Sequence, residues 1–111
     1  FTGIVQKGEK RGTELGYPTA NIPFHEKYMN GIYAARVTVG DSVYPAAVFI
    51  DDTRHVLEAH LLDFTGDLYG KKISVLLEVQ IRDSRTFDND TALRAAIEDD
   101  IQQVRNFFTP V

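Results

Sequence analysis

Short runs rich in Val, Ile, Thr and Tyr, separated by turn residues, follow one another through the first three quarters of the chain. This pattern predicts strands over residues 1–6, 32–39, 43–50, 56–64 and 73–81. Residues 73–81 alternate apolar and polar side chains, as in a strand with one buried face. Such closely spaced strands favour a meander or Greek-key β-barrel over a β-α-β sheet.

The last segment changes from a strand period to a helical period. Apolar side chains recur at helical spacing at Leu93, Ala96, Ile97, Ile101, Val104 and Phe108. Asp88, Asn89 and Asp90 precede them as candidate N-caps. We therefore predict one amphipathic helix packed on the barrel wall. The polar residues Glu98, Asp99, Asp100 and Arg105 are expected on its other side.

Length and composition limit the chain to one compact domain, residues 1–111. It has 111 residues, of which 43% are hydrophobic and 25% charged, enough for a single core. No tract of ten or more apolar residues is present to form a membrane span or a signal sequence, which predicts a soluble, cytoplasmic protein. The absence of cysteine excludes disulfides, thiolate zinc sites and a cysteine nucleophile.

Charge is distributed unevenly along the sequence. The net charge of −4 argues against non-specific nucleic-acid binding. Residues 1–36, however, carry five basic and three acidic side chains. Lys7, Lys10 and Arg11 lie in or beside a loop punctuated by Gly8, Gly12 and Gly16. Such a loop suits an anion such as a phosphate, because glycines let backbone N–H groups converge on its oxygens.

Thr19 and Asn21 offer two neutral oxygens next to this glycine-rich loop. In an extended segment, side chains two residues apart point to the same side. A hydrated Mg²⁺ ion takes few protein oxygens and completes its shell with water and substrate phosphates, so this pair suits it. The spacing alone equally fits a glycine loop that only makes tight turns, and neither a Walker A string nor Gly-x-Gly-x-x-Gly occurs.

Glu58 interrupts an otherwise apolar strand. It shares a predicted strand face with Val56, His60 and Leu62, so it lies at a barrel mouth or pairs internally. A glutamate at such a position can cap an edge, form an ion pair or act as a catalytic base. Further along, residues 67–71 are typical of a turn with an aromatic anchor, and residues 81–88 of a strand-to-helix connection.

Taken together and in order, these segments resemble the riboflavin kinase (flavokinase) family. The resemblance covers essentially the whole chain. Its motifs are the Gly-x-Val-x-x-Gly opening, Leu-Gly-Tyr-Pro-Thr-Ala-Asn at 15–21, Gly-Ile-Tyr-Ala at 31–34, Leu-Glu-Ala-His-Leu-Leu-Asp-Phe at 57–64, Gly-Asp-Leu-Tyr-Gly-Lys at 66–71, and Ile-Arg at 81–82 with Phe87. It implies a small, mainly β fold, a six-stranded antiparallel Greek-key β-barrel with a C-terminal α-helix. The implied reaction is transfer of the ATP γ-phosphoryl group to the riboflavin 5′-hydroxyl, which gives FMN.

The resemblance also implies a role for individual residues. Glu58 corresponds to the general base, and Thr19 and Asn21 to the ligands of Mg²⁺. The positions implied to contact the nucleotide are Lys7, Gly8, Arg11, Gly12, Gly16, Pro18, Thr19, Asn21, Leu61, Asp63 and Tyr69. Those implied to border the flavin are Arg82, Arg85 and Phe87.

The chain departs from the family pattern beside Glu58. Residues 50–55 are shorter than the usual loop and lack its glycine and proline, and Ser84 replaces an acidic residue near the flavin. These departures keep a second hypothesis open, a flavin- or nucleotide-binding regulatory module with weakened catalysis. In bacteria this type of domain commonly forms the C-terminal half of a bifunctional enzyme, so a covalently linked FMN adenylyltransferase domain is a further candidate partner.

Overall fold

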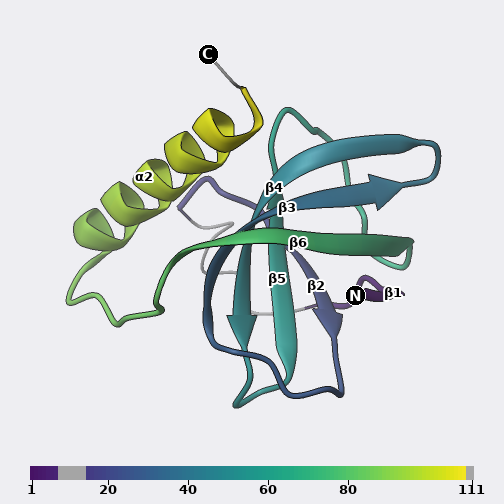
Figure 1. Cartoon of the computed structure of the whole chain (residues 1–111), viewed down its shortest axis with the longest axis horizontal. Helices are drawn as coiled ribbons and strands as arrows, with labels where there is room; N and C mark the ends of the chain where they lie inside the picture. The colour runs from purple at the N-terminus through teal and green to yellow at the C-terminus, as the bar shows by residue number, and fades with distance from the viewer. Residues whose placement is uncertain (8–14, 110–111) are drawn as a thin grey trace.

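The computed structural model describes residues 1–7 and 15–109, which form one mainly β body with a helix on its side (Figure 1). The described residues contain the strands and the helix in the order β1 (Thr2–Ile4), β2 (Ala20–Pro23), β3 (Gly31–Val39), β4 (Ser42–Asp51), β5 (Val56–Leu61), β6 (Lys72–Arg82) and α2 (Asp90–Phe108).

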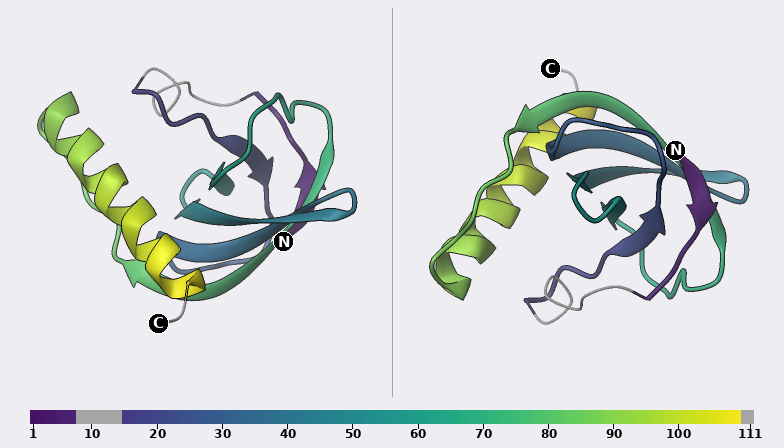
Figure 2. Two further views of the ribbon diagram at one scale, coloured as in Figure 1. Left: turned by 90° about the horizontal axis from the view of Figure 1, so that it is seen from above. Right: turned by 90° about the horizontal axis from the view of Figure 1, so that it is seen from below.

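The strands form one antiparallel sheet that curls into a nearly closed barrel. Its order is β1-β6-β3-β4-β5-β2, so β6 crosses back to lie between β1 and β3. A bridge between Gln6 and Asn21, with a 2.8 Å hydrogen bond from the Gln6 N–H to the Asn21 carbonyl, joins the two ends of this order. The views along the barrel in Figure 2 show the strands wrapping around a common interior. The predicted fold class is confirmed.

Alternating side chains fill the barrel interior. On β5, Leu57, Ala59 and Leu61 are buried, whereas the residues between them are half-buried on the outer face. β3 is buried on both faces near Ala34 and Ala35, where its register with β6 shifts. This double burial has a simple cause, because α2 covers the outer face of the barrel at this point.

The helix α2 packs against β3, β4 and β6 and begins at a conventional cap. The Asn89 side chain accepts a 2.8 Å hydrogen bond from the Ala92 N–H, which confirms one of the three predicted N-caps. Val104 is fully buried with Ala34 and Leu62. Asp100 was expected on the exposed side of the helix, and this was wrong. It lies on the same face as Ile97 and Val104 and is only 4% exposed.

The structure differs from the sequence expectation by one strand that was not predicted and by two strand boundaries that move by more than one residue. β2 was not predicted as a strand, because its four residues end in proline and are too few to show an alternation of apolar and polar side chains. The first strand covers Thr2–Ile4 in place of 1–6. β5 ends at Leu61, not at residue 64, because Asp63 has a left-handed backbone with φ of 58°. Leu62 therefore lies beyond the strand, and it packs with Ala34 and Val104 on the outer side of the barrel, which α2 covers.

The one helix of the described residues is not apolar enough to cross a membrane.

Candidate active site

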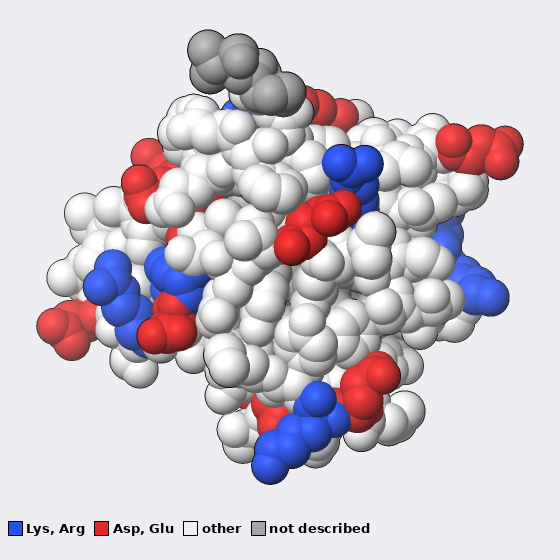
Figure 3. Space-filling model, viewed as in Figure 1, with Lys and Arg blue, Asp and Glu red and all other residues white. Residues whose placement is uncertain are grey.

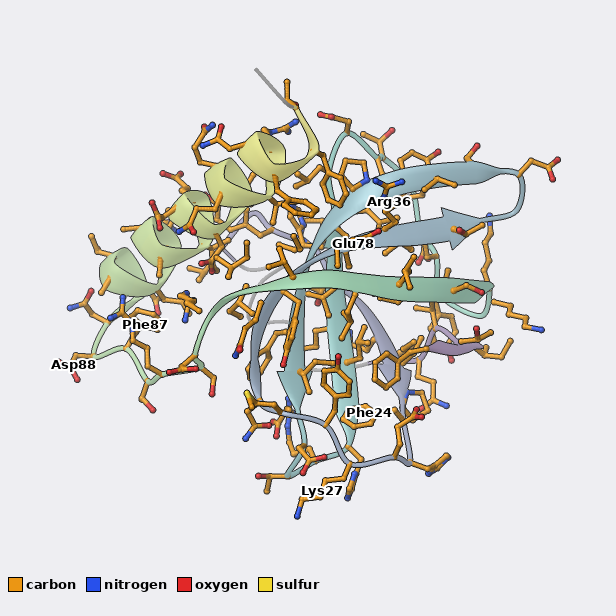
Figure 4. The ribbon with its side chains drawn as sticks, in the orientation of Figure 1. Phe24, Lys27, Arg36, Glu78, Phe87 and Asp88 are labelled. Atoms are coloured by element: carbon orange, nitrogen blue, oxygen red, sulfur yellow. The ribbon has the colours of Figure 1, made fainter. Side chains whose placement is uncertain are left out.

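A first cavity lies between the outer face of the barrel and α2. Glu58 on β5 and Thr19, just before β2, line one wall. Arg82, at the end of β6, and Phe87, on the connection to α2, line another. Figure 4 labels Phe87 on this connection. Arg85 and the helix residues Leu93, Ile97 and Asp100 complete that side. The cavity therefore brings the predicted base together with all three residues predicted to border the flavin.

Glu58 is held at this cavity by a neighbouring cation. Its Oε2 accepts a 3.3 Å hydrogen bond from Nη2 of Arg54, and its side chain is 17% exposed. The register places Glu58 opposite Phe49 of β4 on one side and Asn21 of β2 on the other. Directly opposed residues of an antiparallel pair have Cβ atoms roughly 5 Å apart on one face. Asn21 and Glu58, the predicted metal ligand and the predicted base, are thus neighbours.

The predicted flavin side of the first cavity is built around a buried ion pair. Asp100 accepts two 2.8 Å hydrogen bonds from Arg82, one from Nε and one from Nη2. The Arg82 and Arg85 guanidinium groups lie 5.6 Å and 5.3 Å from the centre of the Phe87 ring. The flat aromatic ring and its two cations form a surface that suits a planar, polar ring system.

A second cavity lies on the other side of Thr19. It has a volume of about 660 Å³, within the range of small-molecule sites, and the first cavity is smaller at about 290 Å³. Lys7, Pro18, Thr19, Asn21, Leu61 and Tyr69 line it, six of the positions predicted to contact the nucleotide. The Lys7 ammonium lies 5.6 Å from the centre of the Tyr69 ring. A cation beside an exposed aromatic ring offers a charged phosphate partner and a stacking surface in one place.

Thr19 is common to the two cavities. It precedes Asn21 by two residues along an extended segment, so the two side chains point to one side of the chain. A threonine hydroxyl and an amide oxygen at the boundary of the two cavities, with the Glu58 carboxylate alongside, fit a hydrated Mg²⁺ ion that also binds substrate phosphates. Mg²⁺ binding by Thr19 and Asn21 stays a prediction.

Tyr17 connects the segment before β2 to the helix across the first cavity. Its hydroxyl donates a 2.7 Å hydrogen bond to Glu98 of α2, and this bond raises the pKa of Tyr17. Its ring packs edge-on against His60, whose Nδ1 lies 2.7 Å from the Pro18 carbonyl oxygen. These contacts fix the backbone immediately before Thr19.

The remaining predicted nucleotide positions lie outside the two cavities or outside the described residues. Gly16 has a left-handed φ of 94°, a conformation that favours glycine, and lies two residues before Pro18. Asp63 lines neither cavity, and its carboxylate accepts two 3.0 Å hydrogen bonds from Arg105 of α2. Gly8, Arg11 and Gly12 fall outside the part of the chain that the structure describes.

The family model for riboflavin kinase (flavokinase) matches residues 1–108. The chain belongs to the riboflavin kinase family. It is 36% identical over 111 residues to a bifunctional riboflavin kinase/FMN adenylyltransferase of Mycoplasma pneumoniae, a match that covers 96% of this chain and 41% of that protein. The chain thus spans less than half the length of that relative.

Solved structures share the riboflavin kinase fold seen here. A riboflavin kinase from Trypanosoma brucei matches with a TM-score of 0.68 and 26% identity over 96% of this chain and 74% of that chain. A structure from Streptococcus pneumoniae, titled as a macrolide-efflux protein, matches with a TM-score of 0.84 and 30% identity over 95% of this chain and 38% of that chain.

Four residues at the first cavity escaped the sequence analysis as site residues, namely Tyr17, Arg54, His60 and Asp100. Asp100 carried a usable signal, because it follows Ile97 by three residues and precedes Val104 by four, which places it on the apolar face. Arg54 precedes Glu58 by four residues, but the turn between them hides their contact from any strand pattern. His60 was expected beside Glu58 on the outer face, and the half-burial of the two residues agrees.

Proposed function

We propose that this chain transfers the γ-phosphoryl group of ATP to the 5′-hydroxyl of riboflavin, giving FMN and ADP. The observation that carries the proposal is the division of the predicted residues between two adjoining cavities. The flavin-side residues line the first cavity and six nucleotide-side residues line the second, with Thr19 in common. Such a boundary is where a phosphoryl group passes from one substrate to the other.

Phosphoryl transfer depends mainly on positioning and on neutralising charge, and the chain supplies groups for each task. The riboflavin 5′-oxygen forms a bond to the γ-phosphorus while the bond from that phosphorus to the β,γ-bridging oxygen breaks. The bridging oxygen leaves with the electron pair as part of ADP. We assign the proton of the 5′-hydroxyl to the Glu58 carboxylate, which lies at the boundary and acts as general base.

Thr19 and Asn21 would hold Mg²⁺, which neutralises the phosphate charge when bound. Lys7 adds positive charge on the nucleotide side, where it lines the second cavity. Arg82 and Arg85, with Phe87 between them, orient the flavin in the first cavity so that its ribityl chain extends toward Glu58.

The deciding experiment measures FMN formation from riboflavin, ATP and Mg²⁺ by the purified chain, with Glu58→Gln as the matched variant. We expect FMN from the wild-type chain. The rate should fall by about 10²–10⁴-fold in Glu58→Gln, the usual contribution of a general base. Riboflavin binding should persist, because glutamine keeps the shape of the side chain. Wild-type turnover by Glu58→Gln would show that the base is assigned wrongly.

The alternative function is a regulatory module that binds flavin or nucleotide with weakened catalysis. Two features support it: the 51–55 loop is short, and the Glu58 carboxylate is already paired with Arg54. A folded chain that binds riboflavin without forming FMN would favour this alternative.

We also propose that the longer protein carries an FMN adenylyltransferase domain. The support is that the Mycoplasma pneumoniae relative is bifunctional and that this chain matches only 41% of it. FAD formation from FMN and ATP by the full-length gene product, and not by residues 1–111, tests this partner. Failure of the full-length product to make FAD would contradict it.

A further inference from the structure

The short loop between β4 and β5 is tied to the rest of the molecule at several points. Within the loop, Oδ1 of Asp51 accepts hydrogen bonds from the N–H groups of Thr53 and Arg54, at 3.1 and 3.2 Å. Outward from it, the Asp52 N–H donates a 2.6 Å hydrogen bond to Oδ1 of Asn30. The loop that departs from the family pattern is therefore an ordered turn, and it fixes the backbone of Arg54.

The Arg54 guanidinium bridges two carboxylates beside the first cavity. Its Nε donates a 2.7 Å hydrogen bond to Oδ2 of Asp51, and its Nη2 donates the 3.3 Å bond to Glu58. Partial burial tends to raise the pKa of Asp51, but hydrogen bonds from Arg54 outweigh it and lower that pKa below its ordinary value. Asp51 is therefore a charged anchor for the guanidinium at neutral pH.

We propose that Arg54 is a positioning residue for Glu58 in the phosphoryl transfer. Anchored by Asp51, its guanidinium holds the carboxylate beside the first cavity, in the orientation that receives the proton of the 5′-hydroxyl. The inference rests on the proposed function, in which Glu58 is the base. It also explains how a loop shorter than the family pattern serves this site, because an ion pair within the turn orders the residues that a longer loop would otherwise have to order.

Other charged or titratable groups of the described residues face the same cavity, and several of them have partners of their own. Arg82 is paired with Asp100, and Arg85 lies over the Phe87 ring. His60 contacts the Pro18 carbonyl. Within residues 1–7 and 15–109, the titratable groups that line the cavity with Glu58 are Tyr17, Arg54, His60, Arg82, Arg85 and Asp100, while its neighbours across the strands, Asn21 and Phe49, are neutral. Arg54 is in direct contact with Glu58.

The test compares kcat and the riboflavin Kd, measured at one pH, in the wild-type chain, Arg54→Gln and Arg54→Lys. In Arg54→Gln the carboxylate loses the charged donor that holds it in place. We expect kcat to fall about tenfold. The riboflavin Kd should change less than about threefold, which separates a loss of alignment from a loss of binding. Arg54→Lys keeps the charge, so its kcat should lie between those of the wild-type chain and Arg54→Gln.

Arg36→Gln is the matched control. Arg36 also pairs with a glutamate, Glu78, at 3.1 Å, but on the outer face of the barrel away from the two cavities (Figure 4). The kcat and riboflavin Kd of this variant should match wild type. If Arg54→Gln fails to fold, Arg54→Met, which keeps the aliphatic stem, takes its place with the same expectation.

An unchanged kcat in Arg54→Gln, with FMN still formed by wild type and lost in Glu58→Gln, would overturn this inference alone. A wild-type rate in Glu58→Gln would instead overturn the assignment of the base, and the role of Arg54 with it. Absence of FMN from the folded wild-type chain would overturn the proposed function and this inference together.

Discussion

The two cavities that meet at Thr19 differ in how their side chains are held. In the first, polar side chains are paired between separate elements: Arg82 of β6 with Asp100 of α2, and Arg54 of the loop with Glu58 of β5. In the second, order comes mainly from the backbone. The Val5 N–H donates to the Lys71 carbonyl at 2.8 Å, and the Gly70 N–H donates to the Val5 carbonyl at 2.9 Å. Side-chain pairs thus shape one cavity and backbone pairing the other.

The difference has a chemical consequence. A cavity ordered by ion pairs presents fixed, oriented groups, which suits a rigid ring that must be aligned for transfer. A cavity ordered by backbone leaves its side chains available for a flexible, charged ligand. Tyr69 is 56% exposed there. Its backbone N–H donates a 2.9 Å hydrogen bond to Asp67, and its ring lies beside the Lys7 ammonium. On the face seen in Figure 3, acidic and basic side chains also lie next to one another, with broad uncharged areas between them.

The largest effect is expected from breaking the buried pair of the first cavity. Asp100→Asn removes the charge that neutralises Arg82 while keeping the size of the side chain. The free energy of unfolding should fall by about 2 kcal/mol, less than for a fully buried pair because the Arg82 side chain is 20% exposed. Riboflavin binding should weaken and MgADP binding should not. Urea unfolding and ligand titrations measure these effects.

Glu78→Gln is the control for that change. Its partner Arg36 has a side chain 55% exposed, so loss of the pair should cost about 0–1 kcal/mol. Equal losses in Asp100→Asn and Glu78→Gln would show that the ion pair beside the first cavity has no special structural role.

A smaller effect is expected from Asn21→Ala, which removes one proposed metal ligand at the boundary. It should weaken MgADP binding and not riboflavin binding, the reverse of Asp100→Asn. MgADP affinity should fall about tenfold, the usual scale of a lost hydrogen bond or ligand contact to a charged group. Riboflavin affinity should stay within about twofold. Isothermal titration measures the two constants, with Asn106→Ala on the exposed face of α2 as the control. Loss of riboflavin binding in Asn21→Ala would contradict the separation of the two cavities.

The smallest effect concerns acid stability. The pKa of Asp63 lies below its ordinary value because of its hydrogen bonds and charge interaction with Arg105, and the pKa of Asp51 is also lowered. A group whose pKa is lowered by folding stabilises the protein above its unfolded pKa and loses that contribution as the pH falls through its folded pKa. The urea midpoint should therefore fall on acidification below about pH 4. Asp63→Asn should reduce this decline slightly, and an unchanged decline would contradict the effect of Asp63.

Local sequence patterns were sufficient to predict the long strand β6 and the helix α2, but they could not predict the contacts between elements. The alternation of residues 73–81 and the helical spacing from Leu93 to Phe108 predicted β6 and α2, because each pattern reflects one buried face. β2 left no such pattern, since it owes its existence to pairing with β5. Asp100 was misplaced for a related reason. Its burial depends on Arg82, eighteen positions earlier, and a helical periodicity that counts only apolar residues cannot show such a partner.

The candidate site shows the same contrast between residues that a motif predicts and contacts that depend on the fold. Its motif residues were found through the family resemblance, and the structure brings ten of them to the two cavities. Asp63 was predicted at a nucleotide position from its motif alone, and its pairing with Arg105 depends on where α2 docks. The contact between Arg54 and Glu58 depends on a turn whose shape is fixed by Asp51, so it becomes visible only once the backbone path is known.

We propose that each cavity takes one substrate, and ligand binding by two aromatic variants tests this assignment. Riboflavin and MgADP titrations would compare Phe87→Ala in the first cavity with Tyr69→Ala in the second. We expect Phe87→Ala to weaken riboflavin binding about tenfold and leave MgADP within about twofold, and Tyr69→Ala to do the reverse. If either variant weakened both ligands equally, or if the two effects were exchanged, the assignment of one substrate to each cavity would be wrong.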